Sequence, residues 1–200
     1  MIQLRPHQER IVTSMVTNPK GQVIVPTGGG KTLCMIKDAQ RVFNSGNKWG
    51  FLLKQPDRKT IVVVSPRILL AQQHSESFEE FLGLHPMLQR KILHVHSGDT
   101  SHESTTNSDA IKYWEKKNSK FNKLIFTTYH SLHRVQESGI NVDTVYFDEA
   151  HNSVQRHFSL LLSFIQVWTM FAAISLLLLL SIISLSNLLA WMIRRSTEKK

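Results

Sequence analysis

The sequence is poor in cysteine and in acidic residues. Its single cysteine, Cys34, excludes an intrachain disulfide framework, and its place in a helical pattern favours a packing role. Lys and Arg number 24 against 15 Asp and Glu, so the formal net charge is +9 at pH 7. This balance favours an anionic partner such as a nucleic acid, a nucleotide or a membrane surface. The N-terminus lacks the apolar run of a secretory signal, so we expect a cytoplasmic protein.

A short β-branched run that stops at three glycines is the most informative stretch. Residues 23–25 suit a buried strand, and apolar residues at helical spacing follow Lys31 and Thr32. Gly28 to Gly30 allow the backbone to turn its N–H groups inward, where the positive end of the helix also points. The layout predicts a polyphosphate-binding loop, with Lys31 on the outer phosphates and the Thr32 hydroxyl on Mg²⁺. The alternative is an ordinary glycine-rich turn between a strand and a helix.

Strand and helix patterns alternate over the first three quarters of the chain. We expect strands at 23–25, 60–65, 91–96, 124–127 and 144–147, and helices at 2–17, 31–43, 68–82 and from 109 onward. This alternation predicts an α/β fold with a doubly wound, mostly parallel sheet. Ligands of such folds bind beyond the carboxyl ends of the strands, where both the glycine loop and the pair Asp148-Glu149 fall.

The strand expected at 144–147 leads directly into two carboxylates. Together with a phosphate loop, such a pair suits metal-assisted phosphoryl transfer. Asp148 would hold Mg²⁺, and Glu149 would orient and deprotonate the attacking water. The alternative is an acidic pair that caps the following helix. We therefore predict that Lys31, Asp148 and Glu149 are the catalytic residues.

Residues 2–157 resemble the first RecA-like lobe of a superfamily 2 helicase of the DEAH-box type. The resemblance rests on five segments in the family's order: Leu4 to Gln8, Pro26 to Thr32, Ser65 to Arg67, Thr127 to Leu132, and Asp148 to His151. The phosphate loop departs from the usual pattern at Val25, where Gly or Ala is expected. The branch that the chain resembles most is shared by type III restriction subunits and phage repair helicases, which implies DNA as the partner.

The resemblance implies ATP and Mg²⁺ as the ligands of the glycine loop. It places the amide of Gln8 at the adenine edge and implies that His151 couples the nucleotide to the strand-binding side. The residues that it implies for nucleotide binding are Gln8, Thr27, Gly28, Gly29, Gly30, Lys31 and Thr32. The implied activity is that of an ATP-dependent DNA helicase or translocase.

Four polar residues in the third and fourth of these segments are candidates for contact with a nucleic-acid backbone. Arg67, Thr127, Thr128 and Ser131 could donate to phosphate oxygens without reading bases, which would make binding salt-sensitive and sequence-tolerant. The alternative is ordinary loop polarity. The lysines between 112 and 123 are interpreted as an exposed helix face, and the three histidines at 94, 96 and 102 lack the spacing of a zinc site.

The composition changes abruptly after His157. From Phe158 to Ile193 the chain has no Asp, Glu, Lys, Arg or His, a stretch longer than the roughly 20 residues that cross a bilayer. We therefore divide the chain into an ATP-binding domain at 1–157 and a hydrophobic helical tail at 158–200. The tail is interpreted either as a membrane segment at 158–193 or as the product of a frameshift.

The resemblance also implies two features that the sequence does not contain. The family has a Ser/Thr-Ala-Thr segment soon after the Asp-Glu pair and then a second RecA-like lobe with an arginine finger. Without that finger we expect a truncated chain with weak activity of its own. The alternative function is a membrane-tethered nucleotide-binding module without motor activity.

Overall fold

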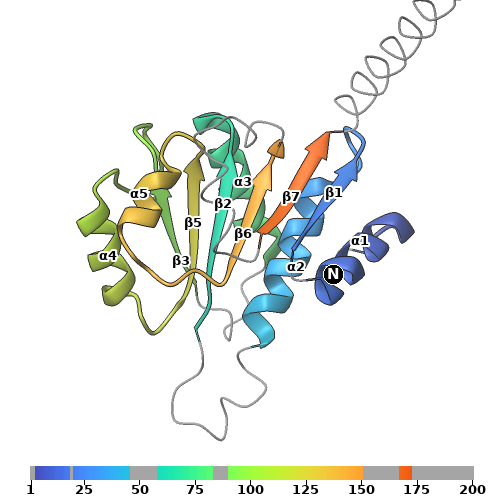
Figure 1. The fold of residues 1–200 in the computed structure, drawn as a ribbon, viewed down its shortest axis with the longest axis horizontal. Helices are drawn as coiled ribbons and strands as arrows, with labels where there is room; N and C mark the ends of the chain where they lie inside the picture. The colour runs from blue at the N-terminus through green and yellow to red at the C-terminus, as the bar shows by residue number, and fades with distance from the viewer. Residues whose placement is uncertain (1–2, 19, 46–57, 83–89, 151–166, 173–200) are drawn as a thin grey trace, which may run out of the picture.

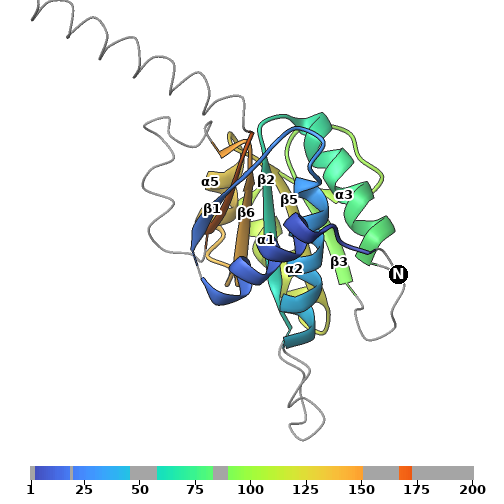
Figure 2. The same cartoon turned by 90° about the vertical axis from the view of Figure 1, so that its right-hand side faces the viewer.

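A parallel sheet with helices on both faces forms the described part of the chain (Figures 1 and 2). The computed structural model describes residues 3–18, 20–45, 58–82, 90–150 and 167–172. Within them the arrangement is the doubly wound α/β fold that the alternating patterns predict.

The sheet has seven described strands in the order β1-β7-β6-β2-β5-β3-β4, and every neighbouring pair is parallel. The central strands β2, β5 and β6 are buried along their whole length, which explains their nearly continuous apolar sequences. The strands are β1 (Gly21–Val25), β2 (Thr60–Ser65), β3 (Arg90–Val95), β4 (Glu103–Ser104), β5 (Asn122–Thr128), β6 (Thr144–Asp148) and β7 (Val167–Ala172).

Five described helices cover the two faces of the sheet. The helices are α1 (Pro6–Thr17), α2 (Lys31–Ser45), α3 (Ile68–Leu82), α4 (Ser108–Lys117) and α5 (Leu132–Glu137). Figure 2 shows α1, α2 and α3 on one side of the sheet and α5 on the other. The α4 helix begins after an N-cap residue, because the Asn107 side chain accepts from the backbone N–H groups of Asp109 and Ala110.

Each face of the sheet has its own apolar core. In β2, Ile61 and Val63 pack in the cluster with α2 and α3, whereas Val62 and Val64 belong to the cluster with α4 and α5. Successive side chains of a strand point to opposite faces, so one buried strand contributes side chains to both cores. The sheet is therefore fixed between two helical layers, and its strand ends are held in place from both sides.

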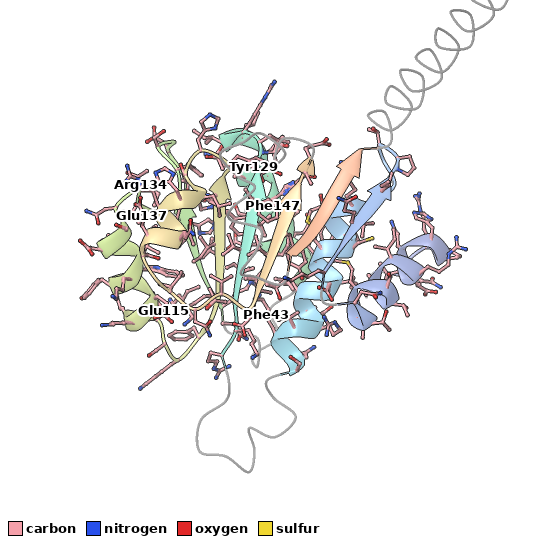
Figure 3. All side chains as sticks on the ribbon, in the orientation of Figure 1. Phe43, Glu115, Tyr129, Arg134, Glu137 and Phe147 are labelled. Atoms are coloured by element: carbon pink, nitrogen blue, oxygen red, sulfur yellow. The ribbon has the colours of Figure 1, made fainter. Side chains whose placement is uncertain are left out.

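The carboxyl ends of the strands meet along one edge of the sheet. The pairing registers set Ser65 of β2 beside Thr128 of β5, and Val64 beside Phe147 of β6. Tyr129, the residue after β5, lies with its ring 5.8 Å from that of Phe147, and Figure 3 labels both side chains toward this end of the sheet. The segments singled out in the sequence are consequently gathered at a single edge.

Residues 167–172 differ from the helical tail expected at 158–200. They form β7, which pairs with both β1 and β6 and joins the sheet between them. Periodicity alone does not separate a buried strand from a buried helix in a run without charges. The other expectations for the tail, together with His151, fall on residues 151–166 and 173–200, outside the described residues, and the division at residue 157 stays a prediction.

Among the described helices, none has the length and apolar character needed to cross a bilayer.

Candidate active site

The loop between β1 and α2 has a backbone that only glycine adopts readily. Gly28 and Gly30 have φ angles of 78° and 83°, in the left-handed region that disfavours side chains. A side chain at Gly29 would collide with Val25, and one at Gly30 would collide with the carboxamide of Gln8. The close approach of these neighbours explains why three glycines stand in a row before Lys31.

The first helix braces this loop from one side. The carboxamide of Gln8 donates to the carbonyl of Gly29 at 3.0 Å and accepts from the N–H of Arg5 at 2.9 Å, while His7 Nε2 lies 3.1 Å from the same Gly29 oxygen. Gln8 is 4% exposed, and its carboxamide links the loop to the start of α1, with one bond to each. A groove of about 740 Å³ lies beside it, lined by α1, β1 and residues 26–29.

Lys31 lies between the two carboxylates that the sequence places 117 and 118 residues further on. Its Nζ is 2.8 Å from Glu149 Oε1 and 3.7 Å from Asp148 Oδ1. The three side chains are 17%, 25% and 7% exposed, so the group is partly shielded from water. Thr32 is half-buried in the first turn of α2, and Thr27 and Gly28 are exposed at the tip of the loop. The structure thus brings the predicted catalytic residues together.

Two residues that we did not predict as part of the site hold Asp148. The hydroxyl of Tyr129 donates to the backbone oxygen of Asp148 at 2.7 Å, and His74 Nε2 lies 3.3 Å from Asp148 Oδ2. Burial raises the pKa of Tyr129, and the neighbouring carboxylates of Asp148 and Glu149 raise it further, so this hydroxyl remains a donor. Burial lowers the pKa of His74, Asp148 acts in the opposite direction, and Lys31 lowers it again.

The donor set fits a bound divalent cation. Asp148 Oδ1 is buried and has no hydrogen-bond partner among the described residues, although the other carboxylate oxygen faces His74. A buried oxygen without a partner is uncommon in folded proteins and commonly marks a functional group or an ion site. Carboxylate and hydroxyl oxygens are the ligands that Mg²⁺ prefers, so Asp148 and Thr32 are suited to hold it.

Glu149 has an unusual backbone. Its φ is 51°, the single positive value for a non-glycine residue in the described part of the chain. Residues in the left-handed region carry a conformational cost, which is found most often at functional sites. The turn at Glu149 aims its carboxylate toward Lys31, whereas a continued strand would turn successive side chains to opposite faces.

Of the four candidates for nucleic-acid contact, Thr127 and Thr128 end β5, while Arg67 and Ser131 lie just beyond β2 and β5, and the four differ in exposure. Arg67 is exposed and Ser131 is half-buried. Thr128 is buried, and its hydroxyl lies 3.4 Å from Ser131 Oγ. Thr127 is fully buried and donates to the carbonyl of Val95 at 2.9 Å. The hydroxyl of Thr127 is therefore already used within the sheet.

The sequence profile described as type III restriction enzyme, res subunit (ResIII), matches residues 1–180. The chain belongs to the ResIII family. A search of curated protein sequences finds no match to this chain.

Solved structures with the same fold include two nucleic-acid enzymes. A nuclease-deletion mutant of the type ISP restriction-modification enzyme LlaGI, in complex with a DNA substrate mimic, matches with a TM-score of 0.67 and 19% identity over 86% of this chain. The UvsW helicase from bacteriophage T4 matches with a TM-score of 0.55 and 16% identity over 86% of this chain. This ResIII chain spans 17% of the first protein and 52% of the second. The shared fold is the RecA-like lobe of superfamily 2 helicases.

His74 and Tyr129, the two additional residues of the site, differ in how far the ResIII sequence indicates them. His74 lies on the face of α3 that also carries the buried Ala71 and Phe78. A histidine on a mostly apolar helix face is a signal, because a buried polar group requires a partner. Tyr129 lies within a segment already noted for nucleic-acid contact. Its hydrogen-bond partner is a backbone oxygen on β6, which no sequence pattern identifies.

Proposed function

We propose that this ResIII chain is the ATP-binding lobe of an ATP-dependent DNA helicase or translocase. Family membership places it among helicase-type nucleoside triphosphatases, whose members use ATP and a divalent metal. The observation that carries the proposal is the convergence of Lys31 with Asp148 and Glu149 at the end of a glycine loop. A positive loop end and a pair of carboxylates on one strand tip suit phosphoryl transfer to water.

The residues would act in three separate roles. The loop N–H groups and Lys31 bind the phosphates, with Lys31 as a point charge on the outermost group. Asp148 and Thr32 hold Mg²⁺, which neutralises charge on the phosphate oxygens when it is bound. Glu149 orients the attacking water and takes its proton.

The contact between Lys31 and Glu149 links phosphate binding to the proposed base. At 2.8 Å, Lys31 is paired with the residue proposed as the base, so an incoming triphosphate competes with Glu149 for the lysine. Binding of the phosphate would draw Lys31 away from the Glu149 carboxylate. Glu149 would then act as a base only when ATP is present.

The proposed DNA track runs beside the ATP site along the same sheet edge. Arg67 is the exposed cation of the track, and Thr128 and Ser131 supply hydroxyls one strand away. Thr127 contributes by fixing the end of β5 against β3. Such contacts bind phosphates and carry no sequence information, which suits a protein that moves along DNA.

We further propose that this lobe binds nucleotide and single-stranded DNA but shows little coupled unwinding by itself. The arginine finger that stabilises the transferring phosphoryl group in related enzymes is worth about 10³ to 10⁵ in rate, and the family places it in a second lobe. Robust unwinding by the purified chain would contradict this part of the proposal.

Nucleotide binding by the full chain tests the proposed function. Titration with a fluorescent ATP analogue in the presence of Mg²⁺ compares the wild type with Lys31→Ala and with Lys37→Ala, a control in the same helix. Loss of a charged hydrogen bond to phosphate predicts an affinity about 10- to 100-fold weaker for Lys31→Ala and unchanged for Lys37→Ala. Equal affinities in all three proteins would overturn the proposal.

A further inference from the structure

A histidine with no part in the proposed chemistry lies against the proposed metal ligand. His74 Nε2 is 3.3 Å from Asp148 Oδ2, and the two side chains are each 7% exposed. His74 belongs to α3, a helix that does not contain any other residue of the site. Its neighbours one turn away on the buried face, Ala71 and Phe78, are apolar, and the adjacent buried Ser75 donates to the carbonyl of Gln72. Asp148 is thus the polar group that faces Nε2, whereas Nδ1 is buried without a hydrogen-bond partner among the described residues.

The two oxygens of the Asp148 carboxylate have different surroundings. Oδ2 faces His74, whereas Oδ1 lies 3.7 Å from Lys31 Nζ and has no hydrogen-bond partner among the described residues. The carboxylate is planar, so a contact that fixes one oxygen also fixes the direction of the other. The His74 contact therefore turns Oδ1 toward the lysine and the glycine loop.

The backbone beneath Asp148 is held independently. The hydroxyl of Tyr129 bonds to the Asp148 carbonyl at 2.7 Å, so the strand end is already fixed by a different residue. His74, in contrast, contacts the carboxylate of Asp148. A carboxylate accepts hydrogen bonds and does not donate them, so the imidazole hydrogen that serves this contact is assigned to Nε2.

We propose that His74 is a positioning residue that orients Asp148 for Mg²⁺ bound with a nucleoside triphosphate. The proposal rests on the function proposed above and adds a residue that acts through a metal ligand. A group that orients a ligand in this way commonly changes metal affinity by about 10- to 100-fold when it is removed. Because α3 begins at Ile68, directly after Arg67, the same helix also joins the proposed DNA track to the metal ligand.

Two substitutions of similar size separate hydrogen bonding from packing. His74→Gln keeps an N–H donor at about the reach of Nε2, and His74→Met has a similar length without a donor. Both residues are good helix formers, so α3 is not penalised. His74→Asn is a third variant, with an amide too short to reach Asp148.

The measurement is the Mg²⁺ concentration that gives half-maximal binding of a fluorescent ATP analogue to the full chain. We expect it to rise about 10- to 100-fold in His74→Met and His74→Asn, and to stay within about threefold of the wild type in His74→Gln. Binding of the same analogue in EDTA should be equal in all four proteins. Urea unfolding without ligands checks that each variant is folded, and His74→Asn replaces His74→Met if the latter is not.

The outcomes distinguish this inference from the proposed function. A wild-type chain that binds no nucleotide, or binds it equally well with and without Mg²⁺, overturns the proposed function and the inference with it. If the wild type requires Mg²⁺ but the folded donor-free variant has the same requirement, only the role of His74 is wrong. An equal loss in His74→Gln and His74→Met would show that ring shape matters rather than the donor, and would also overturn the inference.

Discussion

The hydroxyl of Tyr146 donates to Asp38 Oδ2 at 2.7 Å across the core, and both side chains are almost fully buried. Asp38 lies in α2, the helix that starts at Lys31, and Tyr146 lies in β6, the strand that ends at Asp148. The other oxygen of Asp38 pairs with Arg41 at 2.8 Å. This contact ties together the two elements that carry the two halves of the site.

Replacing Tyr146 with Phe should destabilise the fold. The substitution removes a hydrogen bond to a buried carboxylate, which is worth about 1.5–3 kcal/mol. Urea unfolding measures the loss. Tyr113→Phe is the matched control, because Tyr113 is 70% exposed on α4, and its stability should stay within about 0.5 kcal/mol of the wild type. Equal stabilities for the two variants would show that the buried contact contributes nothing.

The stability of the chain should fall in mild acid because of His94. Burial, with smaller contributions from His96 and His102, lowers the pKa of His94 from 6.5 to about 4. The unfolded chain therefore binds more protons in this interval, so the free energy of unfolding falls as the pH drops from 6.5 through 4. The full loss is about 3 kcal/mol.

The slope of the unfolding free energy against pH measures this effect. It should become less steep in His94→Gln, which cannot titrate. It should persist in His133→Gln, where the histidine that is replaced is exposed in α5. A wild-type stability that does not change between pH 6.5 and 4 would show that the buried ring does not resist protonation.

Glu149→Gln should preserve nucleotide binding or strengthen it slightly. The change removes the carboxylate that holds Lys31 at 2.8 Å, and a partly exposed ion pair of this kind is worth about 0–1 kcal/mol. We expect ATP-analogue affinity between unchanged and about fivefold tighter, because the lysine is released to the phosphates. Titration with the fluorescent analogue measures it, with Glu137→Gln on α5 as the control. Binding more than tenfold weaker would mean that Glu149 itself supports the nucleotide.

Arg67→Ala should weaken single-stranded DNA binding and reduce its dependence on salt. Loss of one phosphate contact lowers the slope of log affinity against log salt by about 0.7. Fluorescence anisotropy with an oligonucleotide at several salt concentrations gives the slope. Lys112→Ala removes the same charge from the exposed face of α4 and should leave the slope unchanged. A smaller slope in the Lys112 variant instead would move the DNA track to α4.

The strands of the central sheet were predictable because their sequences are continuous and β-branched. Residues 60–65, for example, are both the predicted strand and the observed β2. The β4 strand and the α5 helix were missed because they are two and six residues long, too short for a periodic pattern. The β7 strand was missed because its run of uncharged residues continues without a turn signal on either side.

Within the site, the residues that belong to sequence motifs were predictable. The residues that hold those motif residues in place were not. Lys31 and Asp148 could be identified from the sequence, because Lys31 directly follows the glycines and Asp148 directly follows an apolar strand pattern. The contact of Tyr129 with Asp148 depends on strand order, because β2 lies between β5 and β6 and the tyrosine has to reach across its end. His74 likewise meets Asp148 only through the packing of α3 on the sheet.

The position of β7 has a consequence for the order of assembly on the ribosome. In the described residues β1 pairs with β7 alone, and β7 is synthesised after the other six described strands. A nascent chain that has emerged only as far as residue 150 contains the glycine loop and both carboxylates, but it lacks the strand that pairs with β1 in the described sheet. The loop then depends on α1 and α2 for its place, and the gap between β1 and β6 closes only when residue 172 leaves the exit tunnel.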